Sequence, residues 1–304
     1  MRLCSELLLC CLAVLQLGSG YPNLAKRHAD FESVRTHLER DHSNIEDDLP
    51  DKYFHEALFG SHYDGRFADK PLPHDVRQTH LTFLIQTYLS TMNTIGTETW
   101  LMHGSLLGWY WNRKVMPWDD DIDVSISEKS MHHLASFYNM TVHHFTIPGI
   151  ENGRDFLLEV NPHYMIGEVS DEDNRIDARW VDTDTGLFID ITTLRRNLTA
   201  EALGIEGAMM IKDKHHYMYD DIYPLRETEF EGAPAKVPFA YADLLVEEYG
   251  DQALTKTNFH NHRFDTEKQE WLPLRLEIPQ LPPGNFSPWS AKHDGSELEL
   301  DGAS

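Results

Sequence analysis

The sequence predicts one α+β (α/β) domain between residues 53 and 272, built as a mixed sheet flanked by helices. Two observations lead to this fold class. Apolar residues recur at steps of three and four in several segments, which is typical of helices that cover a core on one face. Short apolar or alternating runs typical of strands lie between those segments. Strands and helices mixed within one compact stretch favour a sheet covered by helices.

The strongest predicted helix spans residues 75–95. Its apolar side chains fall on one face, Asp75 is expected to act as its N-cap, and Gly96 is expected to end it. Three further helices are predicted at 106–111, at 127–138 with Ser127 as N-cap, and at 238–249 before Gly250.

The predicted strands are short, and two of them carry polar residues of interest. The strand at 98–102 delivers His103, Gly104 and Ser105 at its end, and the segment 121–126 alternates with the period of a strand. Other strand-like runs cover 141–146, 156–160, 176–181 and 187–191, with a turn at 183–186 that joins the last two as a hairpin.

The N-terminus has the features of a secretory signal peptide over residues 1–20. Arg2 precedes an apolar stretch at 7–17, and small residues follow it. The stretch is too short for a bilayer core of roughly 30 Å, which needs about 20 apolar residues. All three cysteines (Cys4, Cys10 and Cys11) lie inside this segment. We therefore expect a chain in the lumen of the secretory pathway (Golgi or ER) or a secreted chain; an uncleaved signal anchor is the alternative.

The segments that flank the predicted domain are polar. Residues 21–52 form a charged, acidic lead-in, with Lys26-Arg27 as a candidate processing site, and residues 273–304 are expected to be a disordered acidic tail. Glycosylation sequons begin at Asn139, Asn197 and Asn285, which agrees with a lumenal route.

The formal net charge of −24 limits the kinds of molecule that the chain is expected to bind. Such a surface repels nucleic acid and anionic membranes, so we expect no nucleic-acid partner. The same charge would repel a nucleotide, so any phosphate site needs local cations or a metal ion.

Three aspartates form the candidate chemical centre. Asp121 and Asp123 are two residues apart in a predicted strand, so their carboxylates project from the same face. Two such charges at ~4 Å repel by about 4 kcal/mol at an effective dielectric constant of 20. Mg²⁺ or Mn²⁺ would relieve that repulsion. Asp190 lies between apolar neighbours in another strand and needs a partner or a metal, so we place it beside the pair.

Gly104 and Ser105 lie at a strand-to-helix turn, where backbone N–H groups and the helix dipole favour a phosphate. Each signal has an ordinary structural alternative. A Gly-Ser pair is usually only a turn, an Asp-x-Asp pair is usually a solvated surface, and Asp190 could be a hydrogen-bonded core residue. Their order and spacing together favour phosphate chemistry.

The stretch 103–124, together with 186–191, resembles the LicD/fukutin family of the nucleotidyltransferase-fold superfamily. The match is closest to the fungal branch linked to mannosyl-phosphorylation of cell-wall glycans. It rests on Trp100-Leu-Met-His-Gly-Ser-Leu-Leu-Gly108, Ile176-Asp-Ala-Arg-Trp180 and Tyr223-Pro-Leu-Arg-Glu-Thr228, and it covers residues 53–264. One departure is Ile211, where relatives often carry a cysteine; this argues against a cysteine-based zinc site or disulfide.

The resemblance implies a nucleotidyltransferase-like sheet and roles for individual residues. Asp121, Asp123 and Asp190 match metal-binding carboxylates that would hold Mg²⁺ or Mn²⁺, and Gly104 and Ser105 match the turn that binds the donor phosphate. His103 and His215 each could be a base, a ligand or a structural histidine. The candidates for phosphate contacts, with surface salt bridges as their alternative, are Lys114, Arg179 and Arg226.

The implied activity is transfer of a phospho-sugar, with mannose-phosphate favoured, from a nucleotide-diphospho-sugar donor such as GDP-mannose to a glycan hydroxyl. Two alternatives stay open. The chain could be a non-catalytic glycan-binding partner or regulator of a separate mannosyl-phosphate glycosyltransferase, or it could transfer the nucleotide itself. The aromatic run 109–111 could stack on a base or sugar or simply pack in the core.

Overall fold

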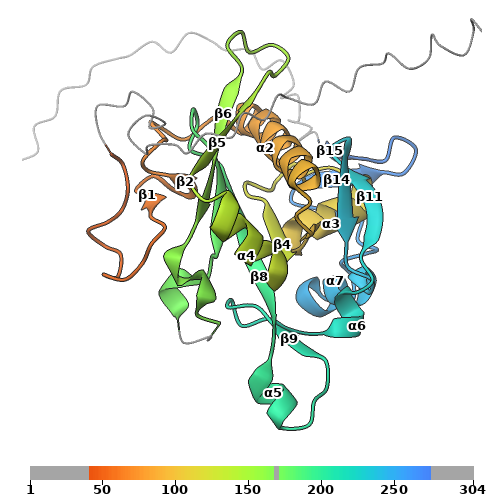
Figure 1. Cartoon of the computed structure of the whole chain (residues 1–304). Helices are drawn as coiled ribbons and strands as arrows, with labels where there is room; N and C mark the ends of the chain where they lie inside the picture. The colour runs from red at the N-terminus through yellow and green to blue at the C-terminus, as the bar shows by residue number, and fades with distance from the viewer. Residues whose placement is uncertain (1–40, 168–170, 275–304) are drawn as a thin grey trace, which may run out of the picture.

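The computed structural model of the chain describes residues 41–167 and 171–274 (Figure 1). A mixed sheet with flanking helices lies at its centre, so the predicted α+β single-domain fold is confirmed. The predicted signal peptide and all but two residues of the predicted tail lie outside the described residues. Within the described ranges, no helix is both long enough and apolar enough to cross a membrane.

The sheet is built around β8 (Phe188–Arg196), whose first half has a neighbour on each side. It pairs in parallel with β4 (Asp123–Ser127) and antiparallel with β7 (Ala178–Asp182), which confirms the predicted hairpin. The sheet continues from β4 to β3 and from β7 to β6 and β5, which span Thr99–Leu101, Arg154–Val160 and Thr141–Phe145.

The far end of β8 extends the sheet into a protrusion at the bottom of Figure 1. There β8 pairs with β9 (Ala208–Met210), and β9 pairs with β10 (His216–Met218). The short helix α5 (Leu198–Ala202) lies in the connection between β8 and β9.

Helices α2 (His74–Ile95) and α4 (Glu128–Phe137) belong to the same apolar core as one face of the sheet. Val124 and Ile191 are paired in adjacent strands and both contribute to that core. Because side chains alternate along a strand, the residues one position earlier, Asp123 and Asp190, face the opposite side. Helices α2 and α4 therefore do not cover the two aspartates.

Helix α2 shows why the periodic pattern was informative. Its buried residues include Leu81, Leu84 and Tyr88, and each large apolar side chain removed from water contributes about 1.5–3 kcal/mol. Gly96 ends the helix at φ 71°, as predicted. The N-cap prediction was wrong, because Pro73 occupies the cap and Asp75 lies in the first turn. There its negative charge interacts favourably with the positive end of the helix dipole.

Two boundaries near the candidate site differ from the prediction. Strand β4 begins at Asp123, so Asp121 precedes the strand instead of lying on it. Helix α3 (His103–Asn112) begins three residues earlier than predicted, which puts Gly104 and Ser105 inside its first turn. The predicted cap of α4 is confirmed, since Ser127 Oγ accepts a hydrogen bond from the Ser130 N–H at 3.3 Å.

The described part of the predicted lead-in packs onto the domain. The His42 N–H donates to the Gly65 carbonyl at 2.9 Å, and Ser43 forms a bridge with Ala57 of β1 (Glu56–Ala57). Strand β2 (Gly60–Asp64) pairs with β1. Folded structure therefore begins before residue 53.

The remaining elements surround α3, on the right of Figure 1, or connect the strands of the sheet. They include two small antiparallel sheets, short helices and two 3-10 helices. These are β11 (Arg226–Phe230), β12 (Ala233–Val237), β13 (Asn258–Phe259), β14 (His262–Asp265), β15 (Glu270–Pro273), α6 (Tyr219–Ile222), α7 (Tyr241–Tyr249), η1 (Pro162–Met165) and η2 (Glu172–Asn174).

Candidate active site

Adjacent parallel strands bring two of the predicted aspartates together. Asp123, the first residue of β4, is in register with Asp190 of β8. Neighbouring strands lie about 4.8 Å apart, so the two side chains leave the same face as direct neighbours. Asp121 lies just before β4. Burial raises its pKa, and the charges of Asp120 and Asp190 raise it further against the opposing effect of His62.

Asp123 is the most perturbed member of this group. Burial raises its pKa well above the usual value, and the negative charges of Asp121 and Asp190 add to that effect, with His103 opposing it. The site therefore concentrates negative charge that the protein neutralises only in part. A bound divalent cation is the common remedy for such a carboxylate group.

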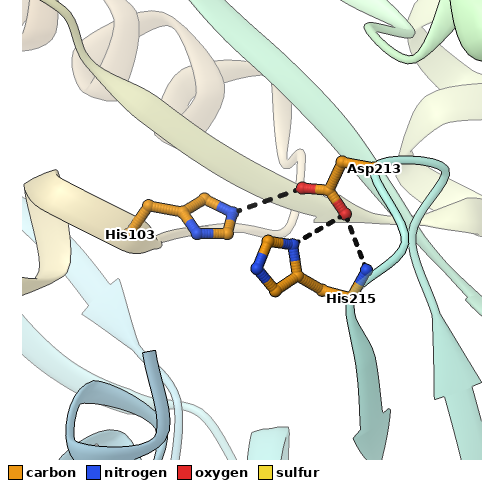
Figure 2. Close-up of side chains that lie close together, drawn as sticks. All are labelled: His103, Asp213 and His215. Atoms are coloured by element: carbon orange, nitrogen blue, oxygen red, sulfur yellow. Dashed lines mark hydrogen bonds and ion pairs between the residues drawn. The ribbon is translucent and has the colours of Figure 1, made fainter. Parts of the chain in front are cut away.

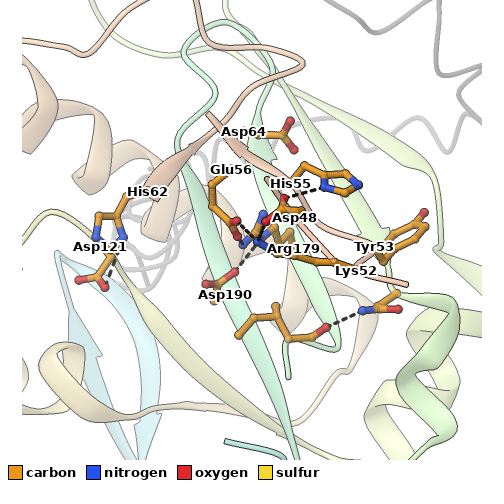
Figure 3. A network of polar contacts seen from close by, with 12 residues as sticks. Asp48, Lys52, Tyr53, His55, Glu56, His62, Asp64, Asp121, Arg179 and Asp190 are labelled. Atoms are coloured by element: carbon orange, nitrogen blue, oxygen red, sulfur yellow. Dashed lines mark hydrogen bonds and ion pairs between the residues drawn. The ribbon is translucent and has the colours of Figure 1, made fainter. Parts of the chain in front are cut away.

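Arg179 holds Asp190 in place (Figure 3). The Arg179 Nε–H donates to Asp190 Oδ1 at 2.8 Å, and Nη2–H donates to Glu56 Oε1 at 2.6 Å. The side chain is 2% exposed, and its guanidinium carbon lies 3.7 Å from the ring centre of Phe188. Arg179, predicted as a phosphate contact, is thus a buried partner that positions Asp190.

The predicted phosphate turn is physically joined to the carboxylates. The backbone N–H of Asp123 donates to Ser105 Oγ at 3.1 Å. A Cβ on Gly104 would lie 2.9 Å from Asp119 Oδ2, so a larger residue there would displace that carboxyl group. Burial raises the pKa of Asp119 to about 7, with the charges of Asp121 and Asp120 adding to it. Asp119 was left without a role in the sequence analysis, because acidic runs are usually exposed.

The two other basic side chains predicted to contact phosphate, Lys114 and Arg226, have their described contacts away from the three aspartates. Lys114 Nζ lies 3.2 Å from Glu270 Oε1, and about half of each side chain is exposed. The Arg226 guanidinium lies over the rings of Phe239 and Tyr241, at 4.5 and 5.4 Å. These described contacts do not include the three aspartates.

Among the described residues, two clusters have ligand atoms within 4.8 Å of one another. One joins His62 with Asp120 and Asp121, and the His62 Nδ1–Asp121 Oδ2 distance is 3.6 Å. The other joins His103, Asp213 and His215 (Figure 2). The three predicted aspartates do not form such a compact group; they are linked by register and by their mutual effect on pKa.

The donor atoms of these aspartates fit the predicted metals. Asp121, Asp123 and Asp190 offer oxygen ligands only, the kind that Mg²⁺ and Mn²⁺ prefer. Burial raises the pKa of Asp121 and of Asp123, and the charges of neighbouring aspartates raise both further, so a bound cation would stabilise the charged carboxylates. His62 is a further neighbour that the sequence analysis missed, because it lies in a segment without regular periodicity.

A cavity of about 420 Å³ opens beside this site. Gly104 and Asp119 form part of its wall, next to Trp111, Trp118 and Trp271. Of the aromatic run 109–111, Trp111 therefore lines the cavity. Trp109 is a core residue instead, 6% exposed, with its indole N–H donating to Thr228 Oγ1 at 2.8 Å.

Comparisons with known proteins give one family match and two yeast relatives. Residues 96–240 match the profile described as LicD/FKTN/FKRP, nucleotidyltransferase domain. The chain is 30% identical over 249 residues to "Mannosyltransferase regulator 4" of Saccharomyces cerevisiae, covering 77% of this chain and 21% of that protein. It is 34% identical over 157 residues to "Mannosyltransferase regulator 14" of the same yeast, covering 48% of this chain and 17% of that protein. The chain thus spans about a fifth of the length of these relatives.

Proposed function

Since residues 96–240 form a nucleotidyltransferase domain of the LicD family, we propose that this chain is a metal-dependent phosphotransferase acting on glycans. The transferred group is a phospho-sugar, with mannose-phosphate favoured, and the donor is a nucleotide-diphospho-sugar such as GDP-mannose. The observation that carries the proposal is the parallel register of Asp123 with Asp190 beside the Gly104-Ser105 turn. The yeast relatives, whose names refer to mannosyltransferases, support the choice of mannose.

In the proposed reaction, a glycan hydroxyl attacks the phosphorus that carries the sugar. The P–O bond to the nucleoside monophosphate breaks, and the nucleoside monophosphate leaves. Mg²⁺ or Mn²⁺ held by Asp121, Asp123 and Asp190 would neutralise charge on the phosphate oxygens. Arg179 keeps the Asp190 carboxylate oriented, and Ser105 holds the start of β4 in position through the Asp123 N–H.

The acceptor proton requires a base near the turn. Asp190 is one candidate, but its Oδ1 already accepts a hydrogen bond from Arg179. Asp119 is the better proposal, because its pKa of about 7 suits proton transfer near neutral pH and it adjoins Gly104.

The aromatic side chains that line the cavity would offer a stacking surface to the base or the sugar of the donor. We assign the nucleotide base or the sugar to the cavity lined by Trp111, Trp118 and Trp271, where aromatic side chains would provide stacking contacts. Lys256, the one lysine or arginine that lines the described cavity, is available for a phosphate oxygen. This role replaces the predicted phosphate contacts of Lys114 and Arg226.

The second candidate function is regulation of a separate glycosyltransferase. The names of both yeast relatives favour it, since each is called a regulator. In that case, the same fold would bind a glycan or a partner enzyme without transferring a group. Either function would operate in the secretory lumen if residues 1–20 act as the predicted signal peptide.

The test mixes the purified chain with Mn²⁺, GDP-mannose and a high-mannose glycan and follows the glycan mass. We expect a gain of one mannose-phosphate, absent with an Asp121→Asn/Asp123→Asn variant. If the intact chain adds nothing, but accelerates a separate mannosyl-phosphate transferase in the same mixture, the regulatory function replaces the catalytic one.

A further inference from the structure

A second cluster of potential ligands lies outside the three aspartates. His103 begins α3, Asp213 and His215 lie in the loop between β9 and β10, and Glu248 belongs to α7. Although these elements are distant in sequence, the side chains of His103, Asp213 and His215 converge (Figure 2). The His103 and His215 ring centres are 5.0 Å apart.

The hydrogen bonds of this cluster leave ligand atoms available. His103 Nδ1 lies 2.8 Å from Glu248 Oε1, and a neutral His103 would donate its proton there and leave a lone pair on Nε2. Nε2 is buried, has no hydrogen-bond partner, and lies 3.7 Å from Asp213 Oδ2. A buried polar nitrogen without a partner costs about 1–3 kcal/mol, so this atom calls for a ligand.

The arrangement of Glu248 matches a recurring feature of metal centres. A histidine that binds a metal through one nitrogen usually donates from the other to a carboxylate, which fixes the ring and its tautomer. Here Glu248 occupies that position. Asp213 Oδ1 is engaged by the N–H and the ring of His215, whereas Oδ2 faces His103.

We propose that His103, Asp213 and His215 form a zinc site, with Glu248 as the carboxylate that orients His103. Two imidazoles and one carboxylate suit Zn²⁺, whereas a site of oxygen atoms alone suits Mg²⁺ or Mn²⁺. The ligand atoms lie within 4.8 Å of one another, and a zinc ion about 2 Å from each would draw them closer. His215 is about half exposed, so its ring is free to adjust.

A zinc ion at this place would support the neighbouring chemistry without belonging to it. It would clamp the loop between β9 and β10 to the start of α3, directly before Gly104 and Ser105. His103 also acts electrostatically on Asp123, so the two sites are neighbours. The proposed zinc site depends only on the geometry of its own residues. It does not require that the chain transfers phospho-sugars.

The test measures zinc bound to the full chain by mass spectrometry of the metal, after chelator treatment and dialysis against Zn²⁺. We expect one zinc per chain, lost in His215→Ala and retained in the matched control His216→Ala. Glu248→Gln should weaken zinc affinity about 10- to 100-fold. The Asp121→Asn/Asp123→Asn variant should keep its zinc, which separates this site from the proposed Mg²⁺ or Mn²⁺ site.

Cobalt provides a second, spectroscopic readout of the same ligands. Co²⁺ bound by two histidines and a carboxylate should give visible absorption bands, and His215→Ala should abolish them. Zinc content that is unchanged in His215→Ala, or an intact chain that retains no zinc, would overturn the proposal. Circular dichroism of each variant checks that loss of metal does not reflect unfolding.

Discussion

Asp123→Asn should stabilise the metal-free chain while removing its proposed function. Two unit charges about 5 Å apart repel by about 3 kcal/mol at an effective dielectric constant of 20. Asp123 and Asp190 are neighbours at that separation, but Arg179 compensates part of the Asp190 charge. Asp123 is also partly exposed, so water screens it further. We therefore expect the variant to gain about 1 kcal/mol in the free energy of unfolding.

The size of this stabilisation should depend on pH. The folded-state pKa of Asp123 is raised above the ordinary value of 3.8. As the pH rises above 3.8, the unfolded chain releases this proton before the folded chain does, so folding stability falls. The stabilisation by Asp123→Asn should therefore be largest near pH 7. It should disappear at pH values below 3.8, where the Asp123 carboxyl group is neutral in both the folded and the unfolded chain.

Urea denaturation with a chelator at several pH values measures this difference, with Asp251→Asn as the control at an exposed carboxylate. Mn²⁺ should stabilise the intact chain, by about 2.7 kcal/mol at 100 times its dissociation constant, and should have little effect on Asp123→Asn. The reasoning fails if the variant is less stable than the intact chain in chelator at pH 7, or if Mn²⁺ stabilises both equally.

Three further predictions concern residues around the site and in the core. Arg179→Met should lower the free energy of unfolding by about 3–5 kcal/mol, because it breaks the buried ion pair with Asp190. Thermal denaturation measures this loss, and a loss below 1 kcal/mol would contradict the pairing. Gly104→Ala should reduce transfer at least tenfold with little loss of stability, since its Cβ displaces the carboxyl group of Asp119; unchanged turnover would remove that group from the mechanism. Burial lowers the pKa of His143 from 6.5 to about 4, so between these values the unfolded chain alone binds the proton and stability should fall by about 3 kcal/mol as the pH drops. His143→Gln should lose this dependence in acid denaturation, whereas His144→Gln should keep it.

The sequence predicted what local patterns encode. The apolar face of α2 and the alternation at 121–126 predicted a helix and a strand, and both contribute apolar side chains to the core. The aspartates were found because their residue type and spacing are unusual for a strand. Boundaries were less accurate, since the cap at Pro73 depends on backbone geometry that composition does not show.

Contacts between distant segments were not predictable from one sequence. His103 meets Glu248 across 145 residues, and nothing local in either segment indicates the other. The pairing of Arg179 with Asp190 depends on the register of the hairpin, which the turn alone did not specify. His62 comes close to Asp121 because β2 lies beside the site. This contact depends on the tertiary fold, and the sequence around His62 has no pattern that indicates it.

The most direct test of the central claim identifies the nucleotide released from GDP-mannose when the chain, Mn²⁺ and a mannose-containing glycan are combined. Phosphorus NMR distinguishes the products. Transfer of mannose-phosphate predicts GMP together with a new phosphodiester on the glycan, and neither should form with Asp121→Asn/Asp123→Asn. Release of GDP with no phosphorus on the glycan, or turnover that persists in the double variant, would contradict the proposed chemistry and its site.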